Sequence, residues 1–73
     1  MTKTLEIRNR DQVERINQLA CHAGCEVWLS NDEVMLNARS LLGLYSLIGQ
    51  RVNVVTGDDV SPGVLDHLVA RMR

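Results

Sequence analysis

The chain has 73 residues and a mass of 8.2 kDa, enough for one small domain, and its 45% hydrophobic and 23% charged residues are typical of a globular protein. Eight basic and nine acidic residues are scattered along it, for a net charge of −1, so the sequence has no basic patch of the kind that binds nucleic acid. No apolar run is long enough to span a membrane and we recognise no signal peptide, so we expect a cytoplasmic protein.

The first elements are a strand and a helix. Residues 4–8 alternate between polar and apolar side chains, the period of a half-buried strand. Apolar residues at helical spacing then predict a helix over residues 11–22. Four polar residues are candidates for capping its start, two as N-caps and two at the capping-box position: Asn9 and Asp11, then Gln12 and Glu14.

Cys21, His22 and Cys25 form a short group at the end of this helix. A structural zinc site needs four ligands in a tetrahedral array, and the one other histidine, His67, lies far along the chain. Two cysteines also fall short of a disulfide framework. We therefore expect no metal, no cofactor, and two reduced, half-buried thiols.

Residues 25–30 and 33–38 alternate again, and only Asn31-Asp32 separates them, which predicts a hairpin with a two-residue turn. In that register Trp28 faces Met35 on the outer face of the sheet. Four apolar side chains share the inner face: Val27, Leu29, Val34 and Leu36.

The second half of the chain predicts a short helix over residues 41–48 with Ser40 as its N-cap, a strand over 51–56, and a final helix that Ser61-Pro62 begins. The element order is β-α-β-β-α-β-α. Because each strand has one apolar face, the predicted fold class is α+β, an open-faced sandwich whose antiparallel sheet is covered by helices on one face.

The short helix is apolar on nearly every side. One side carries Leu44, Leu47 and Ile48, and a different, overlapping side carries Leu41, Leu42 and Tyr45. Such a helix is either fully buried or offers a patch to a partner, and full burial is hard to arrange in so small a domain. The pattern favours a docking surface over a fringe of the core. The rival docking surface is the outer sheet face, with Trp28, Met35 and Val55.

Residues 37–47 (Asn-Ala-Arg-Ser-Leu-Leu-Gly-Leu-Tyr-Ser-Leu) resemble the central segment of HPr, the phosphocarrier family of the bacterial phosphoenolpyruvate:sugar phosphotransferase system. That family's pattern is basic-Ser-apolar-apolar-Gly-apolar-apolar-Ser-Leu. The resemblance is good over residues 25–73 and holds only in outline before them. It implies a single HPr-like domain over residues 1–73, with a four-stranded sheet in the order 1-4-2-3 and three helices on one face.

The start of the first helix departs from the family. HPr carries its phosphate on the histidine of a His-x-Arg-Pro motif there, where the helix N-terminus favours an anion. The matching positions here read Asn9-Arg10-Asp11-Gln12, with no histidine and no proline. His22 lies at the opposite end of that helix and His67 in the last helix. The resemblance therefore implies a divergent member without the phosphoacceptor histidine.

The family's other site is retained. In some bacteria HPr kinase phosphorylates the serine equivalent to Ser40, and the apolar residues beside it dock on that kinase and on a transcriptional regulator. Those positions are Leu41, Leu42 and Tyr45 here. The resemblance thus implies a regulatory, non-enzymatic module of catabolite repression. Its partner would be a kinase, a transcriptional regulator, a phosphotransferase component or a second copy of the chain. The simpler role for Ser40 is helix capping alone.

Two other functions stay open. A small-molecule sensor with a ferredoxin-like fold has the same β-α-β-β-α-β order, but its strands 1 and 3 lie at the centre of the sheet. A residual phosphocarrier would use a group that does not align with the family histidine.

Overall fold

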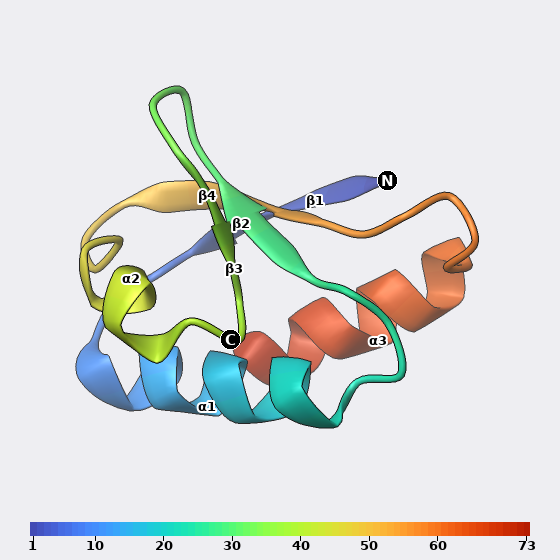
Figure 1. The fold of residues 1–73 in the computed structure, drawn as a ribbon, viewed down its shortest axis with the longest axis horizontal. Coiled ribbons are helices and arrows are strands. Elements are labelled where there is room, and N and C mark those ends of the chain that lie inside the picture. Colours follow the sequence, from blue (N-terminus) through green and yellow to red (C-terminus); the bar gives the residue numbers. More distant parts are fainter.

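The computed structural model describes residues 1–73 as a four-stranded sheet with three helices packed against one of its faces (Figure 1). The strands are β1 (Thr2–Glu6), β2 (Trp28–Ser30), β3 (Met35–Asn37) and β4 (Arg51–Val55). The helices are α1 (Arg10–His22), α2 (Leu41–Tyr45) and α3 (Pro62–Met72).

All strand pairs are antiparallel and the order is β1-β4-β2-β3. The predicted fold class and strand order are confirmed. β4 and β2 lie at the centre of the sheet, where a ferredoxin-like domain would have its strands 1 and 3, so the ferredoxin-like alternative is wrong. No helix has the length and apolar character needed to cross a bilayer.

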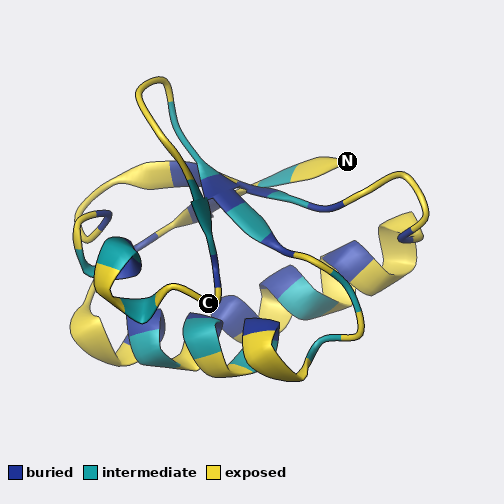
Figure 2. Cartoon of the chain, viewed as in Figure 1, coloured by how far each residue is buried: buried dark blue, intermediate teal, exposed yellow.

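The core lies between the sheet and the helices (Figure 2). A cluster of fifteen buried hydrophobic residues fills it, with members from all three helices and from β1, β2 and β4. Each fully buried aliphatic side chain of this kind contributes about 1.5–3 kcal/mol. The core residues that fix α1 on the sheet are Val13, Ile16 and Ala20, and those that fix α3 are Leu65, Val69 and Met72.

The hairpin pairs two residues away from the predicted register: Leu29 lies opposite Leu36, and Ser30 opposite Met35. Its loop is longer because the Asn31 side chain accepts the backbone N–H groups of Glu33 and Val34, at 2.8 and 2.9 Å. A two-residue hairpin turn would need positive φ at its central residues, and no non-glycine residue here has it.

A shift of two residues keeps each side chain of a strand on its predicted face. Val27 and Leu29 are buried and Leu36 half-buried, as predicted, but Val34 lies in the loop and is 40% exposed. Trp28 faces Asn37 rather than Met35. The strands themselves, β2 and β3, are shorter than the alternating segments that predicted them.

α2 is also shorter than predicted, because the chain tightens into turns after Tyr45. Backbone N–H groups of residues 46, 47, 48 and 50 bond three residues back, and the Ser46 hydroxyl donates to the Gly43 carbonyl at 2.7 Å. Gly49 ends the segment at a φ of +89°. Leu44 and Leu47 are buried as predicted, but Ile48 is exposed.

The last helix begins as predicted. The Ser61 side chain accepts the Val64 N–H at 3.3 Å, and Pro62 is the first helical residue. Val64, in the first turn of this helix, is exposed.

Candidate docking surface at helices α1 and α2

Tyr45 joins α2 to the first two turns of α1. Its hydroxyl donates to Glu14 Oε2 at 3.4 Å, and Arg10 Nε donates to the same oxygen at 3.3 Å. The Arg10 guanidinium also lies 5.9 Å from the centre of the Tyr45 ring. Tyr45, and after it Glu14, raises the pKa of the Arg10 guanidinium. Tyr45 therefore has a defined orientation at the surface.

The structure places the four predicted site residues on one segment but with unequal exposure. Leu42 is 85% exposed, and Ser40 is exposed beside it. Leu41 and Tyr45 are half-buried and pack against the core cluster. Leu41 and Tyr45 therefore belong to the fringe of the core, against the expectation from the sequence, and Tyr45 contacts α1.

We call this region the α2 surface and define it as Ser40, Leu41, Leu42 and Tyr45 together with Arg10 and Glu14. Sequence reasoning missed the last two residues as members. Their four-residue spacing in a helix is typical of an ion pair, but nothing local indicated that Tyr45 would lie against it.

Ser40 stands at the N-cap position of α2 with φ −90° and ψ 84°, and its side chain makes no capping hydrogen bond. The predicted side-chain cap is therefore absent. The hydroxyl is exposed and Arg39 precedes it, with its Nε 3.4 Å from the Ala20 carbonyl oxygen of α1.

The start of α1, where HPr has its phosphohistidine, is occupied by a closed network of hydrogen bonds. Asn9 is the N-cap, since its side chain accepts the Gln12 N–H at 2.9 Å, whereas Asp11 is an exposed residue of the first turn. The Gln12 amide is fully buried. It donates to the Glu6 carbonyl at 2.8 Å and accepts the Arg8 N–H at 2.7 Å. Gln12 thus ties the end of β1 to α1 instead of completing a capping box on Asn9.

Both histidines lie away from the start of α1. His22 is exposed at the other end of α1, with Nδ1 2.8 Å from the Gln18 carbonyl oxygen, and His67 is exposed on α3. Cys21 is exposed rather than half-buried, and Cys25 is half-buried. No three His, Cys, Asp or Glu side chains come close enough together to hold a metal ion.

The rival docking surface, on the outer side of the sheet, contains a hollow of about 450 Å³ next to β2 and β4. Trp28, Met35 and Val55 all line it, as the sequence predicted, together with the carboxylates Glu26 and Asp59.

No family model matches the chain, and no curated protein sequence matches it. Its structure, however, is similar to solved phosphocarrier structures. The crystal structure of HPr-C-His from Thermoanaerobacter tengcongensis aligns with a TM-score of 0.75 and 24% identity, over 99% of this chain and 90% of that one. The phosphocarrier protein HPr from Bacillus anthracis aligns with a TM-score of 0.75 and 18% identity, over 100% of this chain and 96% of that one. The chain has the HPr fold.

Replacing Gln12 by Ala is expected to lower the free energy of unfolding by about 2 kcal/mol, since the Glu6 carbonyl and the Arg8 N–H lose their partner. Urea unfolding measures this change. Gln18→Ala, at an exposed position of the same helix, is the control and should stay within about 0.5 kcal/mol. Equal effects of the two substitutions would show that the Gln12 network contributes nothing.

Ser40→Ala is expected to change stability by no more than about 0.5 kcal/mol, because the Ser40 side chain caps nothing. Ser61→Ala is the matched control, since Ser61 does cap its helix, and its loss should cost about 0.5–2 kcal/mol. Thermal unfolding of both variants compares them. A larger cost at Ser40 than at Ser61 would contradict this description of α2.

Proposed function

We propose that this protein is a non-catalytic, HPr-like regulatory module that docks on a protein partner through the α2 surface and carries no phosphate on histidine. The observation that carries the proposal is Leu42, a leucine that is 85% exposed at the position where the HPr family docks its partners. The shared fold with phosphocarrier proteins supports a partner related to the phosphotransferase system.

The surroundings of Leu42 support docking. Leu42 is exposed next to the half-buried Leu41 and Tyr45, and contiguous apolar surface of this kind marks interaction sites. Beside it, Tyr45 is half-buried and held by Glu14 and Arg10, which gives a preordered aromatic side chain next to an aliphatic one. Aromatic residues and arginine are the common anchors of protein interfaces.

The start of α1 argues against histidine phosphotransfer. A phosphate on a helix N-terminus is stabilised by free backbone N–H groups and nearby cations. Here the Asn9 side chain already accepts the Gln12 N–H, the Gln12 amide has both of its bonds inside the fold, and the exposed Asp11 carboxylate would repel an anion.

Ser40 suits a regulatory role at this surface. Its hydroxyl is exposed and makes no cap bond, so a kinase could modify it without breaking a contact of the fold. A phosphate would add a charge of about −1.5 to −2 beside Leu42. It would also lie next to Arg39, one residue away in sequence, and so change the polarity of the docking surface.

Leu42→Ser is expected to abolish partner capture while leaving the free energy of unfolding within about 0.5 kcal/mol. The test uses the tagged protein as bait in an extract of its native cell and identifies the captured protein by mass spectrometry. Val34→Ser removes another exposed aliphatic side chain, at the tip of the hairpin, and is the matched control.

Capture that survives Leu42→Ser but is lost in Trp28→Ser would assign docking to the outer sheet face and contradict the proposal.

No acid-labile phosphohistidine is expected when the chain is incubated with phosphoenolpyruvate and the upstream phosphotransfer enzyme. The reason for this expectation is that the start of α1 is hydrogen-bonded within the fold and has no histidine. Phosphate incorporation is measured by mass spectrometry under neutral conditions, with an HPr protein as the positive control. A phosphoramidate mapped to His22 or His67 would instead establish a residual phosphocarrier.

A further inference from the structure

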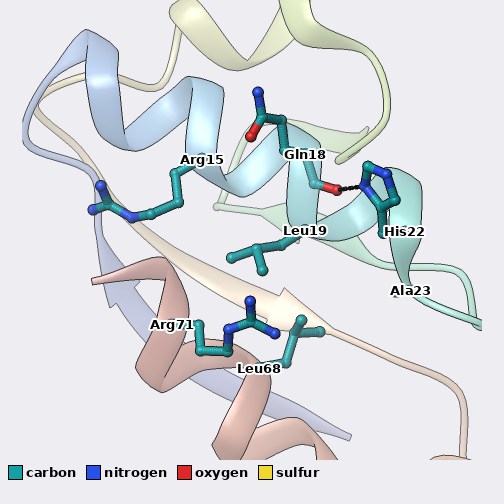
Figure 3. A pocket seen from close by; sticks show the side chains of 7 residues that line it. All are labelled: Arg15, Gln18, Leu19, His22, Ala23, Leu68 and Arg71. Carbon is teal, nitrogen blue, oxygen red and sulfur yellow. Dashed lines mark hydrogen bonds between the residues drawn. The ribbon is translucent and has the colours of Figure 1, made fainter.

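A second surface lies between the carboxyl-terminal half of α1 and α3. A groove of about 360 Å³ runs between the two helices (Figure 3). Leu19 of α1 and Leu68 of α3 lie in it, and the side chains of Arg15, His22 and Arg71 surround them. A neighbouring hollow of about 470 Å³ shares Ala23, Leu68 and Arg71 with this groove and extends it to the start of α3. No residue of the α2 surface lines either part.

The charged side chains that line the groove are both arginines, although the chain as a whole is slightly acidic. Two arginines and two histidines line its two parts, and none of the nine acidic residues does. The nearby carboxylates are engaged elsewhere: Asp66 pairs with Lys3 at 2.7 Å, and Glu14 pairs with Arg10 on the α2 side. Asp11, one turn before Arg15, lies outside the groove and forms no ion pair with Arg15 or Arg71.

The two arginines differ in how firmly they are held. Arg15 donates from Nη2 to the backbone oxygen of Arg73, the last residue of the chain, at 2.7 Å, which fixes its direction beside the end of α3. Arg71 makes no ion pair at all. The guanidinium of Arg15 on α1 is therefore fixed and that of Arg71 on α3 has no ion-pair partner, and Leu19 and Leu68 lie between the two. This arrangement matches an anionic partner that also buries apolar side chains.

We propose that this groove binds an acidic amphipathic helix of a partner protein. Its apolar side chains would cover Leu19 and Leu68, and its carboxylates would face Arg15 and Arg71. α3 has 11 residues and is therefore about 16 Å long, which corresponds to about three turns of a helix lying along it. Nucleic acid fits less well, because no aromatic side chain lines the groove to stack on bases.

The test titrates the ¹⁵N-labelled chain with a synthetic 18-residue helical peptide that has leucines along one face and glutamates along both flanks. Amide signals of residues 15–23 and 63–71 are expected to shift. Arg71→Glu should weaken binding by about tenfold or more, and a peptide with lysine in place of glutamate should restore binding to that variant. Arg51→Glu, an exposed arginine on the sheet, is the matched control and should leave the dissociation constant within about twofold.

Three results would overturn the proposal. The first is equal binding of a peptide with glutamine in place of glutamate, which would make the charge irrelevant. The second is a set of shifts confined to the α2 surface or the outer sheet face. The third is tighter binding of a single-stranded oligonucleotide than of the acidic peptide in the same groove.

Discussion

The buried amide of Gln12 is the interaction on which the functional part of this fold depends. It bonds to backbone groups at Glu6 and Arg8 and so ties the end of β1 to the start of α1. The first two turns of α1 lie beside α2. Because the amide and the Asn9 cap use the polar groups at the helix start for the fold itself, this end of α1 serves as a structural joint.

The position of α2 follows from this joint. Leu44 and Leu47 anchor it in the core, and the first turns of α1 hold Tyr45 from the side. Leu42 is the residue of this short helix that faces solvent, because neither the core nor α1 covers it. The proposed docking surface is therefore a consequence of packing a short apolar helix at the edge of a small core, with one side covered by α1 and the other facing solvent.

Features that depend on neighbours in the sequence were predictable. Period-two and helical patterns located every element, Ser61 marked the start of α3, and Asn9 was one of two candidate N-caps for α1. The hairpin register could not be predicted, because two turn geometries compete there and the Asn31 side chain selects the one with the longer loop. The partial burial of Tyr45 could not be predicted either, because it needs α1 as a tertiary partner. The same holds for the α1–α3 groove, whose charge pattern combines residues as distant in sequence as Arg15 and Arg71.

Partner binding on the α2 surface of this HPr fold is tested by nuclear magnetic resonance of the ¹⁵N-labelled chain, mixed with its purified partner. We expect amide signals of residues 10–14 and 40–45 to shift or broaden first, while those of Trp28, Met35 and Val55 stay in place. Shifts centred on these three residues, with the signals of α2 unchanged, would contradict it.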